Sequence, residues 1–325
     1  MHHNSKQNTQ SQAHAGSGAT KPPKTASHLP FEQGPDMTEI IKHLEDLHGR
    51  YDAAFVDLWG CVHNGLTAYP AAISALQSFR ARGGKVVLLT NAPRPRTSVE
   101  KQIRKMGVPD DAWDTIATSG DSARLAMFQG AVGENVYFIG EPHDTSFFEP
   151  LSMVTDPVKI SRVPLDQADG IVCTGPFDSH ADPSVNRADF LFAKTRGLKM
   201  LCANPDLVVD RGESREWCAG ALAQLYTEMG GESLYFGKPH PPIYDLARRR
   251  LLEIGGSDTD QIICIGDGIA TDVQGAIGEG LDAIFITGGL AASETGTAEH
   301  PQAELLASFL NDARMSPTFA MGFLR

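Results

Sequence analysis

The sequence predicts an α/β protein, in which a parallel sheet wrapped by helices is interrupted by a second α/β unit. Two observations lead to this fold class. Short apolar runs typical of buried strands alternate with segments of helical spacing along most of the chain. The alternation continues through a middle region that behaves as a unit of its own. The length of 325 residues, with 41% hydrophobic and 21% charged residues, fits a globular protein of one large or two medium domains.

The first part of the chain is predicted to begin with a helix and then to alternate between strands and helices. An amphipathic helix is expected over 38–48, because apolar residues recur there at helical spacing. These apolar residues are Ile40, Ile41, Leu44 and Leu47. The expected strands that follow are 53–58, 85–90 and 115–117, and the expected helices are 71–82 and 97–106.

The middle and the end of the chain continue this alternation. The middle is expected to contain strands at 135–140, 170–173 and 199–203, and helices near 120–130, 185–196 and 216–229. After it come strands at 233–236, 262–265 and 283–287, and helices at 241–254 and 271–279. The predicted organisation is a core over 37–124 and 231–325, with the inserted unit over 125–230. Residues 1–36 are poor in large apolar groups, cannot offset their ordering entropy, and are expected to be disordered.

The charge and the cysteines narrow the class of protein. A net charge of -12 argues against a broad nucleic-acid surface, because neutralising phosphates requires clustered Lys and Arg. No stretch approaches the ~18 apolar residues of a membrane helix, and no signal-peptide apolar region is present. The five cysteines contain no Cys-x-x-Cys pair and are expected to be buried free thiols. We therefore expect a cytoplasmic protein without nucleic-acid or membrane partners.

Polar residues follow four of the predicted strands, and together they suit phosphoryl transfer. Strands of a parallel sheet deliver their carboxyl ends to one edge, so these residues are expected to share one crevice. Asp57 is the candidate nucleophile, because a carboxylate can attack phosphorus and form an acyl phosphate. Thr90 and Asn91 would contact phosphoryl oxygens. Lys238 would place a positive charge where negative charge builds up.

A magnesium site is expected at the same edge. Asp57 and Asp267 would hold Mg²⁺, a hard cation that prefers oxygen ligands and is usually held by one or two carboxylates. Asp272 stands about one turn into the helix that follows Asp267. It would either orient a metal-bound water or pair with Lys238.

The order of these motifs resembles the haloacid dehalogenase (HAD) superfamily of aspartate-nucleophile hydrolases, in particular its NagD-type class IIA. The segments that carry the resemblance after the first motif are Leu88-Leu89-Thr90-Asn91-Ala92-Pro93, Ala203-Asn204-Pro205-Asp206, Gly237-Lys238-Pro239 and Gly266-Asp267-Gly268-Ile269-Ala270-Thr271-Asp272-Val273. The resemblance covers roughly residues 50 to 295, and its specificity lies in the order and context of the motifs. The first motif, Asp57-Leu58-Trp59-Gly60, resembles that of a bacterial class IIA group with Asp-x-Trp-Gly.

The resemblance implies a Rossmann-like core with a type C2 cap inserted over roughly 125–230. It implies an Mg²⁺-dependent phosphatase that acts through phospho-Asp57 on a small phosphorylated metabolite, such as a sugar phosphate, a nucleotide or an aryl phosphate. The backbone carbonyl of Trp59 would join the carboxylates at the metal. Asn204 and Asp206 would lie in a cap loop that faces the core. Because class IIA caps often pair, a homodimer through the cap is an expectation.

One position departs from the family pattern. HAD phosphatases keep an acid two residues after the nucleophile, which protonates the leaving alcohol and later activates water, and Trp59 stands at that position. General acid–base help of this kind is typically worth ~10²–10⁴-fold. Three interpretations stay open. The enzyme uses substrates with good leaving groups, another residue such as His63 takes over the proton, or the protein binds a phosphorylated ligand with little turnover.

Two functions of other classes stand beside the phosphatase. A phosphometabolite-binding or regulatory protein on this scaffold would show saturable binding with negligible turnover. Attack on carbon, as in haloacid dehalogenases that carry an aromatic residue two positions after the nucleophile, ranks last. Those enzymes do not use this kind of cap and would not require the metal pair.

Overall fold

The computed structural model describes residues 38–141, 144–211 and 214–325. The disorder predicted for residues 1–36 therefore lies outside the described residues. The larger of two principal sheets has seven strands, and every neighbouring pair in it is parallel. Its strands lie in the order β1 (Glu39–Ile40), β14 (Phe319–Met321), β13 (Asp282–Ile286), β12 (Ile262–Gly266), β2 (Ala53–Val56), β3 (Lys85–Thr90) and β4 (Thr115–Thr118).

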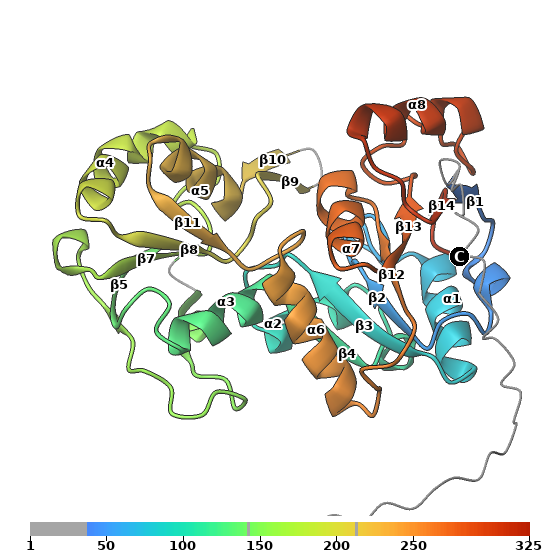
Figure 1. The fold of residues 1–325 in the computed structure, drawn as a ribbon, viewed down its shortest axis with the longest axis horizontal. Coiled ribbons are helices and arrows are strands. Elements are labelled where there is room, and N and C mark those ends of the chain that lie inside the picture. The colour runs from blue at the N-terminus through green and yellow to red at the C-terminus, as the bar shows by residue number, and fades with distance from the viewer. Residues whose placement is uncertain (1–37, 142–143, 212–213) are drawn as a thin grey trace, which may run out of the picture. The chain divides into compact units, whose positions relative to one another are not determined.

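Helices cover both faces of this sheet, which is why its central strands read as unbroken apolar runs. Side chains alternate between the faces, so Ala54 and Val56 of β2 point to one face and Ala53 and Phe55 to the other. The first face packs against α1 (Pro70–Ala81) and α2 (Arg96–Lys105), and the second against α6 (Pro241–Glu253) and α7 (Gln274–Gly278), as Figure 1 lets the reader follow. The predicted parallel core is thereby confirmed.

The second principal sheet belongs to the inserted unit. Its five parallel strands lie in the order β11 (Glu232–Tyr235), β8 (Lys199–Cys202), β7 (Gly170–Cys173), β5 (Asn135–Ile139) and β6 (Ser161–Arg162). One face packs against α4 (Arg187–Thr195) and α5 (Ala219–Glu228), and α3 (Ser119–Phe128) packs against the other (Figure 1). β11 pairs in this sheet, although the boundary predicted at residue 230 placed its residues in the core segment.

A hairpin near the site was not predicted. β9 (Val208–Arg211) and β10 (Ser214–Trp217) pair antiparallel, and the end of β10 occupies the start of the range predicted as a helix from residue 216. Helix α5 begins only at Ala219, so the helix prediction was wrong for its first residues. Only Leu207 separates β9 from the Asn204-Pro205-Asp206 segment.

The helix predicted over 38–48 was wrong. The segment forms the short strand β1 and a 3₁₀ turn over Leu44–Leu47. Ile40 pairs with Ala320 of β14, while the Asp46 carboxylate accepts hydrogen bonds from the backbone amides of Lys42 and His43. Of the apolar residues that suggested a helix, Ile41, Leu44 and Leu47 are buried, whereas Ile40 is exposed.

The carboxyl-terminal segment adds two elements to the core that the sequence did not indicate. Helix α8 (Ala303–Ala313) packs its apolar side against Phe285 and Ala320, and β14 inserts between β13 and β1. All five cysteines are buried and free, as expected. Within the described ranges, no helix has both the length and the apolar character to cross a bilayer.

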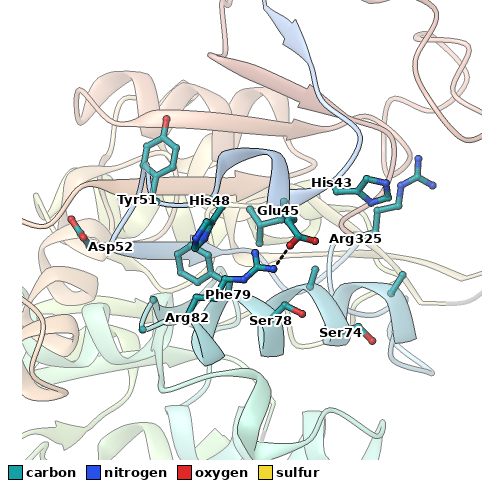
Figure 2. Close-up of a pocket in the computed structure, with 16 residues that line it drawn as sticks. His43, Glu45, His48, Tyr51, Asp52, Ser74, Ser78, Phe79, Arg82 and Arg325 are labelled. Carbon is teal, nitrogen blue, oxygen red and sulfur yellow. Dashed lines mark hydrogen bonds and ion pairs between the residues drawn. The ribbon is translucent and has the colours of Figure 1, made fainter.

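A cavity of about 440 Å³ opens between the 3₁₀ turn and α1 (Figure 2). Tyr51 and Asp52, which line it, precede β2, so the cavity lies at the amino edge of the sheet. The side chains of Glu45 and Arg82 pair within it. Because ligands of open α/β sheets bind at the carboxyl edge, this cavity is not the expected active site.

Candidate active site

The predicted site residues come together around a different cavity, of about 1380 Å³. Asp57 directly follows β2, Thr90 ends β3, and Asp267 directly follows β12. These three strands are neighbours, so their carboxyl ends bring the three side chains to one edge of the sheet. The candidate residues that line the cavity are Asp57, Trp59, Thr90, Asn91, Asn204, Asp206, Lys238, Asp267 and Asp272.

Lys238 is the centre of a buried ion cluster. It reaches the site from the loop between β11 and α6, so it follows a strand of the second sheet and not of the core. Its Nζ lies 2.6 Å from Asp57 Oδ1 and 2.7 Å from Asp272 Oδ1, and the residue is 2% exposed. Of the two arrangements expected for Asp272, the structure contains the pairing with Lys238.

Burial and mutual charge shift the titration of these groups. Burial disfavours the charged form of Lys238, but Asp272 and Asp57 outweigh it and hold the pKa of the ammonium above its usual range. Burial raises the pKa of Asp57 well above its usual range, and Asp272 and Asp267 add to this while Lys238 opposes it. Burial and the charge of Asp272 raise the pKa of Asp267 to about 7. Ionising the whole set therefore requires more positive charge than Lys238 provides.

A divalent cation fits that requirement. Asp57, Asp267 and Asp272 together carry three negative charges when ionised and Lys238 carries one positive charge, which leaves two negative charges to be balanced. Carboxylate oxygens are the ligands that hard cations prefer. Ligand atoms of Asp57, Cys61 and Asp267 lie within 4.8 Å of one another.

Two glycines form the cradle of the Asp267 carboxylate. A Cβ atom added at Gly60 would lie 2.0 Å from Asp267 Oδ2, and one added at Gly289 would lie equally close. Gly60 also has φ +71°, a conformation that favours glycine. The backbone amide of Leu290 donates a hydrogen bond of 3.2 Å to the same oxygen. The chain thus packs backbone directly around this acid and fixes its position.

Asn91 lines the cavity and its side chain joins two loops of the site. Its Oδ1 accepts a hydrogen bond from the backbone amide of Lys238 (2.7 Å), and its Nδ2 donates to the carbonyl of Lys238 (3.1 Å). The same Nδ2 donates to Asp206 Oδ1 at 2.8 Å. The side chain that was predicted to contact phosphate therefore holds the lysine loop and the Asn-Pro-Asp loop together. Thr90 keeps its place at the cavity, where its Oγ1 accepts a hydrogen bond from the Ala92 amide.

Trp59 lines the cavity as an apolar wall. Its ring packs over Gly65, where a Cβ atom would come within 2.3 Å of the indole, and makes an edge contact with His63 at 5.4 Å between ring centroids. His63 is 1% exposed and does not line the cavity, and its Nδ1 accepts a hydrogen bond from the Gly65 amide. Burial lowers the pKa of His63 to about 4, so the ring is neutral near pH 7. The structure therefore does not support the suggestion that His63 takes over the proton, because the ring is buried and does not line the cavity.

Two residues near the reacting groups were not singled out by the sequence. Cys61 directly follows the first motif, and the sequence indicated only a buried thiol there. Burial raises its pKa, so it remains protonated. His240 lines the cavity two residues after Lys238 and stacks on Tyr235 with ring centroids 4.8 Å apart. The signal for both was their closeness in sequence to a motif residue.

An α/β core with an inserted second sheet, and a buried lysine among acids at the carboxyl edge, define a hydrolase-like architecture. Family models agree with this description: residues 54–152 match a haloacid dehalogenase-like hydrolase model and residues 235–313 match a HAD-hydrolase-like model. A solved haloacid dehalogenase-like hydrolase from Brucella suis 1330 is 39% identical, covers 88% of this chain and 100% of its own, and superposes with a TM-score of 0.75. The chain belongs to the haloacid dehalogenase-like hydrolases, within their NagD-like class IIA.

More distant relatives carry named activities of their own. The ribonucleotide monophosphatase NagD of Escherichia coli strain K12 is 22% identical over 237 residues, which is 73% of this chain and 87% of that protein. A glycerol phosphate phosphatase of Mycobacterium tuberculosis, solved in complex with calcium, is 22% identical with a TM-score of 0.57 and covers 77% of this chain and 70% of its own. At 22% identity, the likeness to this solved structure shows a shared fold alone.

Proposed function

We propose that this hydrolase is an Mg²⁺-dependent phosphatase that acts on a small phosphorylated metabolite through phospho-Asp57. The observation that carries the proposal is the buried cluster of Asp57, Lys238 and Asp272 beside Asp267. It places a carboxylate, a fixed positive charge and a set of oxygen ligands in one cavity. The named phosphatases among the relatives support the same reaction class.

Asp57, Lys238 and Thr90 have different roles in the proposed phosphoryl transfer. A carboxylate oxygen of Asp57 attacks phosphorus and forms an acyl phosphate, which splits one difficult displacement into two easier ones. Lys238, fixed by two carboxylates and by the Asn91 clamp, neutralises charge on the phosphoryl oxygens without having to reorganise. The Thr90 hydroxyl offers a further hydrogen bond at the cavity wall.

The metal would be held by Asp57, Asp267 and the backbone carbonyl of Trp59, with Asp272 supporting the set through its bond to Lys238. When bound, Mg²⁺ supplies charge stabilisation to the transferred phosphoryl group. The two negative charges that Lys238 leaves unbalanced are the feature of this chain that supports a divalent ion. Cys61, as a neutral thiol, adds no hard ligand to the set.

The test is phosphate release from a panel of sugar phosphates, nucleotides and aryl phosphates, with and without Mg²⁺. We expect Mg²⁺-dependent turnover that Asp57→Asn abolishes, while the variant keeps the thermal stability of a folded protein. Metal binding is followed separately by titration calorimetry. Turnover that survives Asp57→Asn, or that persists after chelation, would contradict the proposal.

Trp59 favours one further candidate of a different class. Trp59 stands where the usual general acid would be. The second proposal is therefore a protein that binds a phosphometabolite with weak or no turnover. It predicts saturable binding of a phosphate ester to Asp57→Asn and wild type alike, with no phosphate released by either. Any Asp57-dependent turnover that reaches ordinary enzyme rates, on the order of 1–10³ s⁻¹, rules it out.

A further inference from the structure

The core offers no acid at the usual position, but the inserted unit brings one to the same cavity. We propose that Asp206, carried by the Asn204-Pro205-Asp206 loop between β8 and β9, is the general acid and base of this enzyme. The inference rests on the proposed phosphatase function and names the group that completes it. It moves the proton-transferring residue from the core to the cap.

The direction of the reaction places the leaving group away from the carboxyl edge of the core sheet. In phosphoryl transfer the attacking and leaving oxygens are roughly in line across phosphorus. Asp57 attacks from the edge of the core sheet, so the leaving oxygen faces away from the core. Asp206 lines the same cavity and is carried by a loop of the inserted unit, so it is an acid that does not come from the core edge.

The Asn-Pro-Asp loop is held against the reacting groups by several contacts. Asp206 Oδ1 accepts the 2.8 Å hydrogen bond from Asn91, whose amide also clamps the backbone of Lys238. The Asn204 side chain fixes the turn by accepting a hydrogen bond from the Asp206 amide at 3.0 Å. A Cβ atom at Gly237 would come within 2.5 Å of the Pro205 ring, so the loop packs directly on the lysine loop. Asp206 is thus positioned by the same network that positions Lys238.

The environment of Asp206 suits a group that must carry a proton. Burial raises the pKa of its carboxyl, Asp272 adds to this, and the Asn91 hydrogen bond and the charge of Lys238 oppose it. Oδ1 is engaged by Asn91, whereas Oδ2 has no hydrogen-bond donor among the residues that the structure describes. One oxygen is therefore held in place and the other is available to a ligand in the cavity.

The two half-reactions balance with Asp206 as acid and then as base. In the first, an Asp57 oxygen bonds to phosphorus and the bond from phosphorus to the leaving oxygen breaks. The electron pair goes to that oxygen, which takes the proton of Asp206 and departs as the alcohol. In the second, Asp206 carboxylate takes a proton from water as its oxygen bonds to phosphorus. The bond to Asp57 breaks, phosphate leaves, and Asp57 is a carboxylate again with Asp206 protonated.

Other proton carriers line the cavity, among them Glu141, Glu216 and His240. Asp206 is distinguished by its direct hydrogen bond to the side chain that holds Lys238. His240 is the strongest competitor, because it lies two residues from Lys238. Its ring is stacked on Tyr235, and burial lowers its pKa. A lowered pKa makes the ring a poorer general acid at neutral pH, because less of it is protonated.

The test uses Asp206→Asn, because an amide oxygen can still accept the hydrogen bond from Asn91 but the side chain no longer carries a titratable proton. Two substrates of similar shape are compared, p-nitrophenyl phosphate with a good leaving group and phenyl phosphate with a poorer one. With the first, Asp206→Asn should release a burst of one nitrophenolate per active site and then turn over ~10²–10⁴-fold more slowly than wild type, because only water activation needs the base. With the second, the burst should be absent, because cleavage itself needs the acid.

The controls separate this role from a merely structural one. Asp206→Ala removes the hydrogen bond as well as the proton, and His240→Asn removes the competing proton carrier. The proposal is overturned if Asp206→Asn turns over both substrates as fast as wild type while Asp206→Ala raises KM. Asp206 would then only hold the two loops together through its hydrogen bond to Asn91. The proposal is equally overturned if the burst followed by slow turnover appears in His240→Asn and not in Asp206→Asn. If wild type itself shows no Asp57-dependent turnover, the phosphatase function fails and this inference fails with it.

Discussion

Replacing Gly60 by alanine tests whether the Asp267 cradle organises the metal site. The new methyl group would lie 2.0 Å from Asp267 Oδ2, whereas real contacts of this kind are not closer than 3.0 Å. The carboxylate would have to move by about 1 Å, and a misplacement of that size near the reacting groups can cost ~10²-fold in rate. The backbone adds a separate cost, because φ is +71° and a side chain in this left-handed region costs roughly 1–2 kcal/mol.

Gly49→Ala is the matched control for this substitution. Gly49 has φ +76° but nothing lies within 4 Å of its would-be Cβ, so it shares the backbone strain without the clash. Gly49→Ala should lose roughly 1–2 kcal/mol in the free energy of unfolding, measured by urea denaturation, and Gly60→Ala should lose at least as much because the clash adds to the same strain. Only Gly60→Ala should bind Mg²⁺ more weakly by calorimetry and lose ~10²-fold in kcat/KM. If the two variants bind metal and turn over alike, the cradle does not position Asp267 for function.

Three further predictions follow from burial and charge. Lys238→Met leaves Asp57 and Asp272 buried without their cation, so the free energy of unfolding should fall by ~3–5 kcal/mol at pH 7 and turnover should be lost. In contrast, Lys199→Met breaks an exposed pair and should cost less than ~1 kcal/mol. Because the pKa of His63 is lowered from 6.5 to about 4, the unfolded state binds protons first. As pH falls from 6.5 to 4, His63 should contribute a loss of on the order of 3 kcal/mol in the free energy of unfolding. Asp267, with its raised pKa, titrates in the same range with the opposite sign, so the His63 contribution is measured as the difference between wild type and His63→Gln in urea titrations. A homodimer through the cap is expected, and Leu191 on α4 is an apolar cap side chain that is 54% exposed. If this side chain lies in the dimer interface, Leu191→Asp should shift the mass by light scattering from dimer to monomer, and an unchanged mass would count against that surface.

The core could be predicted from sequence because its strands carry their own signal. β2, β3 and β12 are buried on both faces, so each appears as an unbroken apolar run followed by a polar residue. β14 has no such signal: it has three residues and is defined by pairing with its neighbours on both sides. Its partner β1 was wrongly predicted as part of a helix for the same reason. The spacing of apolar residues along β1 carries no information about its pairing with β14.

In the candidate site too, some contacts could be predicted from the order of the strands and others could not. That Asp57, Thr90 and Asp267 would meet follows from topology, because parallel strands end at one edge. The contact between Asn91 and Asp206 spans 115 positions and depends on how a loop of the second sheet meets the core. No local pattern encodes that approach. The sequence therefore indicated candidate residues in each part, and the structure was needed to pair them.

Trp59 and Asp206 are best understood together. An acid on the core loop would act whatever the position of the cap, whereas Asp206 reaches the cavity only while the Asn-Pro-Asp loop is docked on Asn91 and Gly237. Placing the proton on the cap would therefore make the docked loop a condition for chemistry as well as for excluding water. Trp59→Asp should then restore phenyl phosphate cleavage to Asp206→Asn, because the core would again carry its own acid. Failure of this rescue while each single variant stays folded and binds Mg²⁺ would mean that the tryptophan has a further function in shaping the cavity.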